Sequence, residues 1–350
     1  MADWKNNVRE VVPYTPGEQP KAKVIKLNTN ENPYPPSPLV GKAVSDVKLD
    51  ILRKYPDPNC SGLINSLAKY HGFEDENIFV GVGSDDVLAM SFLTFFNSDR
   101  PVFFPDITYS FYDVWADLFR IPYETKALDD DFKINPSDYS KPCGGIVIPN
   151  PNAPTGIAES VEFFEAIIKA HPECVVIIDE AYVDFGSNSC IDLVRKYDNL
   201  LVVRTFSKSR AMAGSRIGYA IGSKELIKYL SDCKFSFNSY TMDTITLATG
   251  VASIEDDEYF KARLSDVIST REWTKEKLTE LGFTFPDSKS NFIFAKHNSV
   301  DATYIFEELK KQGIYVRHFS KPQRIADYLR ISIGTDEEMQ ILIDTLKKIL

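Results

Sequence analysis

From about residue 60 onward, short unbroken apolar segments alternate with longer stretches of helical periodicity, and this alternation constrains the fold most strongly. Short unbroken apolar segments are typical of parallel strands that are buried on both faces. Amphipathic helices between such strands indicate an α/β layered fold with a mostly parallel central sheet sandwiched by helices. The predicted strands are Ile78–Val80, Val102–Phe104, Ile146–Ile148, Val175–Ile178, Leu200–Val203 and Ile217–Ile221. The predicted helices are Leu63–His71, Val87–Phe96 and Val161–Ala170.

The two ends of the chain differ from this central pattern. Residues 11–38 contain seven prolines, which avoid helical conformations and so predict an extended arm. After about residue 242 the pattern becomes that of a smaller α+β domain, with the elements Asp257–Leu281, Asn291–Ala295, Ala302–Gln312, Ile314–Val316, Leu329–Ile333 and a helix from Asp336. We therefore predict an N-terminal arm (1–30), a large domain (31–242) and a small C-terminal domain (243–350).

Composition excludes several classes of function. The 350 residues carry a net charge of −10 without a basic stripe, so we expect no nucleic-acid partner. The N-terminus has no apolar signal core, and no segment approaches the ~18 apolar residues of a membrane span, so we expect a cytoplasmic protein with no membrane partner. No C-x-x-C pair occurs, which predicts neither a metal site nor a disulfide framework among Cys60, Cys143, Cys174, Cys190 and Cys233.

Two chemically distinctive residues follow neighbouring apolar segments. Asp179 follows Val175–Ile178, and Lys208 follows Leu200–Val203 in the segment Arg204-Thr205-Phe206-Ser207-Lys208. In an α/β sheet, ligands bind near the carboxyl ends of the strands. A lysine there can form a Schiff base with an aldehyde cofactor, and an aspartate can pair with a protonated pyridine nitrogen. A lone lysine would be an ordinary surface group, but this pair suits pyridoxal phosphate (PLP).

Gly81-Val82-Gly83-Ser84-Asp85-Asp86 follows another predicted strand and opens a helix. The third glycine of a dinucleotide-binding fingerprint would fall at Asp86, so that interpretation fails. Free amides at a helix start favour an anion, which makes this segment a candidate phosphate cradle. Alternatively, Ser84 only caps the helix.

Other candidate site residues are aromatic, amide or cationic. Tyr109 could lie on a flat ring, or could be an ordinary half-buried tyrosine. Tyr182 and Asn152 could each donate to a ring oxygen, although Asn152 also suits a simple turn. Arg330 interrupts an apolar strand, and with Arg317 it could bind a carboxylate or phosphate; a structural salt bridge is the alternative.

Together these motifs resemble the fold type I PLP enzymes of aminotransferase class I/II, and among them the histidinol-phosphate aminotransferases. The likeness extends from Tyr14 to Gly334. It rests on Leu27-Asn28-Thr29-Asn30-Glu31-Asn32-Pro33-Tyr34, Tyr55-Pro56-Asp57, Ser207-Lys208 with Arg216, and Leu329-Arg330-Ile331-Ser332-Ile333-Gly334-Thr335.

The resemblance implies specific roles. Lys208 would bond covalently to the cofactor and carry the proton, Asp179 would hold the ring nitrogen, Tyr182 would reach the ring oxygen, and Tyr109 would stack on the ring. Residues implied around the cofactor phosphate are Gly83, Ser84, Asp85, Ser207 and Arg216, with Tyr55 from a partner subunit. Residues implied at the anionic end of the substrate are Tyr14, Asn291, Arg317 and Arg330.

One position departs from the family pattern. The family commonly has asparagine directly before Pro-Thr-Gly, whereas this chain has Ala153, so Asn152 would take over the contact with the ring oxygen. The resemblance also implies a homodimer that transfers an amino group between a phosphorylated amino compound, histidinol phosphate, and 2-oxoglutarate, forming glutamate. An aromatic amino acid aminotransferase, a lyase like threonine-phosphate decarboxylase and a non-enzymatic PLP-binding regulator are the alternatives.

Overall fold

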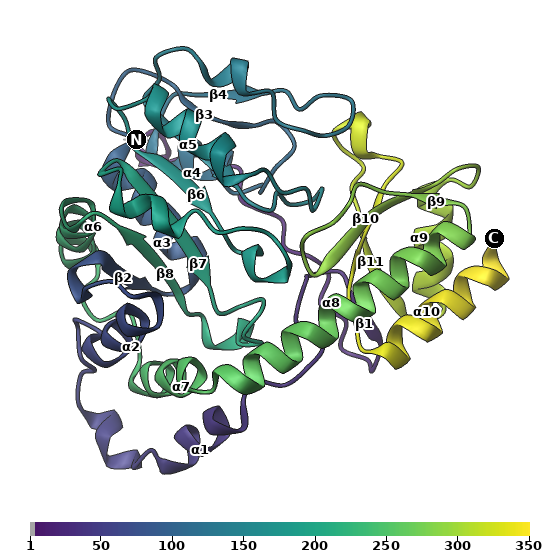
Figure 1. Ribbon diagram of the computed structural model, residues 1–350, viewed down its shortest axis with the longest axis horizontal. Helices are drawn as coiled ribbons and strands as arrows, with labels where there is room; N and C mark the ends of the chain where they lie inside the picture. Colours follow the sequence, from purple (N-terminus) through teal and green to yellow (C-terminus); the bar gives the residue numbers. More distant parts are fainter. Residues whose placement is uncertain (1–3) are drawn as a thin grey trace.

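The computed structural model describes residues 4–350 and contains a larger and a smaller sheet at opposite ends of the molecule (Figure 1). Within these residues the larger sheet has seven strands in the order β2 (Ile78–Gly81), β8 (Gly218–Gly222), β7 (Leu200–Thr205), β6 (Val176–Asp179), β5 (Gly145–Pro149), β3 (Val102–Pro105) and β4 (Tyr123–Lys126). The predicted α/β class is confirmed. Strand β8 is antiparallel to both of its neighbours, so the expectation that Ile217–Ile221 runs parallel to the other strands is wrong.

Helices cover both faces of this sheet, which explains the unbroken apolar strands. In β5, Ile146 and Ile148 belong to the core under α2 and α5, whereas Val147 belongs to the core under α3 and α4. Every position of β5 therefore loses contact with water, and alternation with polar residues disappears in this strand. The helices of this part are α1 (Pro38–Asp46), α2 (Ser61–His71), α3 (Gly83–Phe95), α4 (Tyr112–Phe119), α5 (Val161–Ala170), α6 (Lys224–Phe237) and α7 (Thr244–Glu255).

The N-terminal arm contributes one strand to the smaller sheet. Its strand order is β1 (Ile25–Leu27), β11 (Ile314–His318), β12 (Leu329–Ser332), β10 (Phe292–His297) and β9 (Phe283–Thr284), and β1 pairs in parallel with β11. The helices packed with it are α8 (Asp257–Glu280), α9 (Ala302–Lys311) and α10 (Asp336–Ile349). The division expected at residues 242 and 243 falls just before α7, which packs against α1 and α2 of the larger layer.

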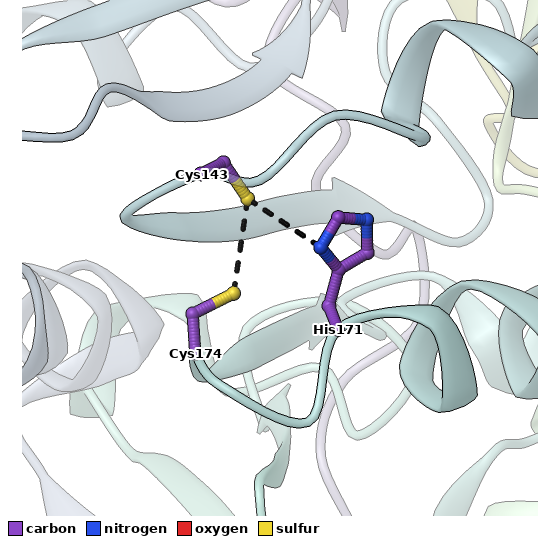
Figure 2. A group of neighbouring side chains, drawn as sticks. All are labelled: Cys143, His171 and Cys174. Carbon is purple, nitrogen blue, oxygen red and sulfur yellow. Dashed lines mark hydrogen bonds between the residues drawn. The ribbon is translucent and has the colours of Figure 1, made fainter.

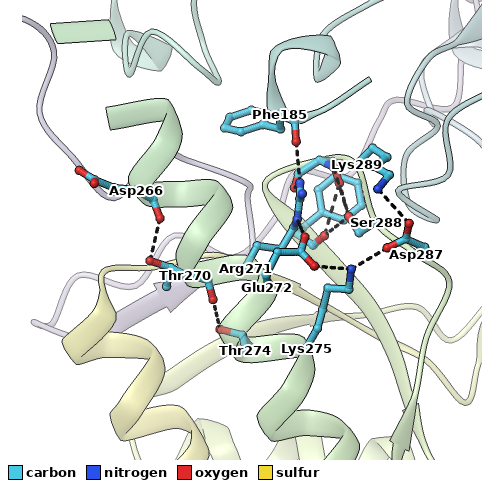
Figure 3. A network of polar contacts seen from close by, with 12 residues as sticks. Phe185, Asp266, Thr270, Arg271, Glu272, Thr274, Lys275, Asp287, Ser288 and Lys289 are labelled. Carbon is cyan, nitrogen blue, oxygen red and sulfur yellow. Dashed lines mark hydrogen bonds and ion pairs between the residues drawn. The ribbon is translucent and has the colours of Figure 1, made fainter. Parts of the chain in front are cut away.

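Helix α8 extends from α7 along the smaller sheet, and one buried arginine of this helix contacts both the loop after β6 and the residue before β10 (Figures 1 and 3). The Arg271 guanidinium donates to the carbonyl oxygen of Phe185 at 2.7 Å and to that of Ser290 at 3.0 Å. Phe185 ends the short 3-10 helix that directly follows Tyr182, and Ser290 lies just before β10. Arg271 thus fixes the loop after β6 relative to the smaller sheet.

No helix formed by residues 4–350 is long and apolar enough to cross a membrane.

Candidate active site

The carboxyl ends of four strands bring the predicted site residues to one edge of the larger sheet. Gly83 follows β2, Asn152 follows β5, Asp179 ends β6, and Lys208 follows β7. Strands β5, β6 and β7 are parallel neighbours, so their carboxyl ends lie side by side. The expectation that these residues gather at one edge is confirmed.

Lys208 projects its amino group toward the arm and the tyrosine expected beside it. Its Nζ donates to the carbonyl oxygen of Thr29 at 3.4 Å and lies 5.6 Å from the centre of the Tyr182 ring. The Asn32 amide donates to the backbone carbonyls of Lys208 and Ser209 at 3.1 and 3.2 Å, which holds the lysine backbone in place. Among the described residues no carboxylate forms an ion pair with this amine, so it stands available for a ligand.

Asp179 is a buried carboxylate held by neutral groups only. Its two oxygens accept hydrogen bonds from the Tyr112 hydroxyl at 2.9 Å and the Ala181 amide at 3.1 Å. Burial raises the pKa of Asp179 to about 6, and the nearby carboxylates of Asp85 and Glu180 act in the same direction. A buried carboxylate with this environment would be stabilised by a cation from a ligand.

Tyr182 is positioned by a residue that the sequence interpretation missed. The Asn30 side chain donates to the Tyr182 hydroxyl oxygen at 2.9 Å, and its own oxygen accepts from the Ser332 hydroxyl at 3.0 Å. Asn30 has a φ of 56°, a conformation that asparagine adopts more readily than most residues. The only signal in the sequence was the polar, asparagine-rich segment at residues 28–32.

Asn291 holds the backbone of Asn30 in place. It is fully buried, and its amide donates to the carbonyl oxygen of Asn30 at 3.0 Å. In this arrangement Asn291 reaches the site through Asn30, whereas the sequence interpretation expected it to hold the substrate.

The start of α3 forms a compact anion site. No side chain caps this helix, whose N-cap is Val82, so Ser84 is not a capping residue. A Cβ atom on Gly83 would lie 2.5 Å from Arg216 Nη2, so glycine is required for the guanidinium to come this close to the helix start. Arg216 Nη1 is also 3.4 Å from the Ser207 hydroxyl. Free amides, a hydroxyl and a guanidinium therefore converge as a phosphate would require.

Asp85 links this anion site to the predicted stacking residue. Its carboxylate accepts from the Tyr109 hydroxyl at 2.6 Å and pairs with Arg216 Nη2 at 3.0 Å. Burial and the Asp85 carboxylate raise the pKa of Tyr109, so this tyrosine is a neutral donor. The ring of Tyr109 packs edge-on against Tyr112, which itself donates to Asp179. One chain of contacts thus connects the anion site to the buried carboxylate.

The side-chain amide of Asn152 already forms hydrogen bonds within the protein. It donates to the carbonyl oxygen of Ile107 at 2.9 Å and to the Thr155 hydroxyl at 3.2 Å, and its oxygen accepts from Thr108. A bond from Asn152 to a ring oxygen would require one of these contacts to break. Ala153 is buried and has no donor to offer, so Tyr182 is the better placed of the predicted donors.

Arg317 and Arg330 line a cavity of about 770 Å³ together with Tyr14 and Tyr109. They are directly opposite each other on β11 and β12. Arg330 donates to the carbonyl oxygen of Asn28 at 3.0 Å, while its buried Nε has no partner. Burial lowers the pKa of Arg330. Neither arginine forms an ion pair within residues 4–350, so the salt-bridge alternative finds no support and an anionic ligand suits them.

Tyr55 lies outside the site of its own chain. Its side chain is 81% exposed, and its ring contacts Tyr240 at a centroid distance of 4.6 Å. Any contact with a cofactor would have to be made in another subunit.

Comparison with known proteins identifies the family. Residues 22–346 match the model of the family described as aminotransferase class I and II. The chain is 50% identical over 348 residues to a histidinol-phosphate aminotransferase of Clostridium botulinum (strain Okra / Type B1), which covers 99% of this chain and 98% of the relative.

Solved structures of low sequence identity share the fold. A histidinol-phosphate aminotransferase from Clostridium acetobutylicum superposes with a TM-score of 0.86 at 22% identity, covering 93% of this chain and 99% of that one. The same enzyme from Sinorhizobium meliloti, solved in complex with pyridoxal-5'-phosphate, gives a TM-score of 0.84 at 24% identity, covering 93% and 91%. With its fold, its strand-end lysine and aspartate, and a family match over nearly the whole chain, this protein belongs to the aminotransferase class I and II family.

Proposed function

We propose that this protein is a PLP-dependent aminotransferase that moves the amino group of L-histidinol phosphate to 2-oxoglutarate, a step of histidine biosynthesis. The observation that carries the proposal is the 50% identity to a histidinol-phosphate aminotransferase over 99% of the chain. The arrangement of Lys208, Asp179 and the paired arginines supplies the chemistry that such a reaction needs.

The residues present fit PLP. Asp179 is a buried carboxylate that lacks a cationic partner, which a protonated pyridine nitrogen would supply. The uncapped start of α3 and Arg216 suit a phosphate group. Lys208 lies between them in the fold, with its amine free of carboxylates. PLP, when bound, withdraws electrons from the substrate's α-carbon, which makes loss of its proton feasible.

Each residue of the site then has a defined task. Lys208 would hold the cofactor through its Nζ, and the same Nζ, when free, would accept the α-proton of the substrate. Asp179, when ionised, would pair with a protonated ring nitrogen. Tyr182, oriented by Asn30, would donate to the ring oxygen, and Tyr109 would cover one face of the ring.

Arg317 and Arg330 give the site its preference for substrates with an anionic end. A guanidinium fork matches phosphate and carboxylate oxygens alike, so the same pair can serve histidinol phosphate and glutamate in turn. The cavity of about 770 Å³ that they line leaves room for a substrate with a ring and a phosphate.

A panel of amino donors offered to the purified protein with 2-oxoglutarate tests the proposed reaction. Glutamate should form with histidinol phosphate at far higher kcat/KM than with histidinol or phenylalanine. Equal turnover of histidinol and its phosphate would favour an aromatic aminotransferase, and release of carbon dioxide without use of 2-oxoglutarate would favour a lyase. Borohydride should fix the cofactor to Lys208; a label on another lysine would overturn its assignment.

A further inference from the structure

Two cysteines and a histidine meet at the edge of the larger sheet opposite to the candidate active site (Figure 2). Cys143 lies just before β5, His171 directly follows α5, and Cys174 lies just before β6. Strands β5 and β6 are parallel neighbours, so their amino ends are adjacent. Asp179 lies at the other end of β6, which separates this cluster from the proposed PLP site.

The spacing of the three ligand atoms is close to that around a tetrahedral metal ion. The two sulfur atoms are 3.7 Å apart, and Cys143 Sγ is 3.9 Å from His171 Nδ1. All three atoms lie within 4.8 Å of one another. Zinc bonds of about 2.3 Å to sulfur and about 2.0 Å to nitrogen place tetrahedral ligands about 3.5–3.8 Å apart. Small side-chain movements would therefore complete such a site.

The hydrogen bond of His171 Nε2 leaves the lone pair of Nδ1 facing the other candidate ligands. Its Nε2 contacts the carbonyl oxygen of Tyr139, which can only accept, so Nε2 carries the hydrogen. In the neutral ring, Nδ1 then directs a lone pair toward Cys143 Sγ and toward Glu173 Oε1, which is 3.4 Å away. Two acceptors facing each other need a proton or a cation between them. Metal-bound histidines have such a second contact to a carbonyl oxygen.

The loop that carries two of these ligands is held in place and is open to solvent on one side. The Asn199 amide donates to the carbonyl oxygens of His171 and Cys174 at 2.8 and 3.0 Å. Cys143, Glu173 and Cys174 line a cavity of about 470 Å³, which provides an entry path. Cys143 and His171 are themselves almost fully buried.

We propose that Cys143, His171 and Cys174 form a site for a thiophilic divalent cation, Zn²⁺, with the Glu173 carboxylate as the fourth ligand. Zinc sites with four protein ligands are structural. The ion would link the amino ends of β5 and β6 through its ligands. It would stabilise the fold without taking part in amino transfer.

Zinc titration of the reduced, chelator-treated holoenzyme against a fluorescent zinc indicator tests this proposal. The native protein should bind one Zn²⁺ per chain, and its Tm should rise with zinc concentration. Cys174→Ser and His171→Gln should each weaken binding by more than the ~10–100-fold typical of losing a second-shell partner. Glu173→Gln should weaken it less. Cys233→Ser, which changes a cysteine of α6, is the matched control and should bind zinc like the native chain.

Alkylation with iodoacetamide supplies a readout that does not depend on the variants' stability. Zinc should protect Cys174, which is only partly buried, from the reagent in the native holoenzyme, while Cys233 reacts at an unchanged rate, as mass spectrometry can measure. Equal labelling with and without zinc, or no zinc binding by the reduced native protein, would overturn the proposal. So would a Cys143–Cys174 disulfide whose reduction restores no zinc binding.

Discussion

At the scale of single residues, the burial of Asp179 destabilises the ligand-free protein and favours binding of a cationic ligand. Its carboxylate is held at full burial by a hydroxyl and an amide, without a cation. Burial raises its pKa from the ordinary 3.8 to about 6, so near neutral pH the ionised form is destabilising until a cationic ligand arrives. This imbalance favours binding of a protonated pyridine ring over a neutral one.

Asp179→Asn should therefore stabilise the cofactor-free protein while abolishing most activity. Because the folded-state pKa is raised, the favourable contribution of the native carboxyl is complete below pH 3.8 and is lost as the pH rises through about 6. The variant should then exceed the native protein in free energy of unfolding by up to ~3 kcal/mol at pH 8, and the difference should vanish near pH 4. Urea unfolding at both pH values measures this, with the exposed Asp130→Asn as control. A native-like rate in Asp179→Asn would remove the residue from the mechanism.

The arginine pair yields a second prediction at this scale. Arg330→Ala should weaken both histidinol phosphate and glutamate, because losing one partner of a desolvated charge pair costs ~2–5 kcal/mol. Arg317→Ala should impair the phosphorylated substrate more than glutamate, because the phosphate lies at the end of a longer arm. Steady-state kinetics separates the two effects, and the visible spectrum of the bound cofactor should stay unchanged. A loss confined to kcat would indicate that Arg330 acts elsewhere.

At the scale of secondary structure elements, α8 connects the site to the smaller sheet. Through Arg271 it binds the carbonyl of Phe185, three residues after Tyr182, and the carbonyl of Ser290 before β10. Two elements that are distant in the sequence are therefore held by one side chain that is 3% exposed.

Arg271→Met should lower the free energy of unfolding by about 2–4 kcal/mol, since two buried carbonyl groups lose their donor. It should also weaken cofactor binding, because the loop after β6 carries Tyr182. Urea unfolding and cofactor titration measure the two effects, and Glu276→Met on the exposed face of α8 is the matched control. Native cofactor affinity in a destabilised Arg271→Met would show that α8 supports the fold alone.

At the scale of the whole molecule, the chain exposes several large apolar side chains close together in the sequence. Leu49, Leu52 and Tyr55 are 78%, 52% and 81% exposed, and Tyr240, whose ring contacts that of Tyr55, is 46% exposed. Exposed apolar side chains grouped in this way are typical of interaction sites. We propose a homodimer in which Tyr55 reaches the cofactor phosphate of the partner chain.

Hybrid dimers test this proposal directly. Tyr55→Ala and Lys208→Ala should each be nearly inactive alone, whereas mixing them should restore part of the activity, because one site of the hybrid then has both residues. Sedimentation of the mixture confirms that dimers are present. A fully active monomer at low concentration, or no recovery in a demonstrated hybrid, would contradict the shared site.

The α/β class, most strands of the larger sheet and the strand-end positions of Asp179 and Lys208 could be predicted from the sequence alone. These features are local: a strand buried on both faces is apolar at nearly every position, Asp179 is the last residue of β6, and Lys208 comes three residues after the end of β7. Helix α5 has the bounds that its periodicity predicts. The edge strand β4 was missed because its residues are mostly exposed and lack an apolar run.

The contacts between segments that are far apart in the sequence could be known only from the tertiary structure. It set the antiparallel direction of β8, brought Asn30 of the arm to the Tyr182 hydroxyl, occupied the amide of Asn152, and placed Cys143 beside Cys174. The periodicity of apolar residues in the sequence indicates whether a residue is buried, but it does not indicate which residues pack against it. Strand direction, hydrogen-bond partners and ligand clusters depend on contacts between segments far apart in the chain, so they arise only when the whole chain has folded.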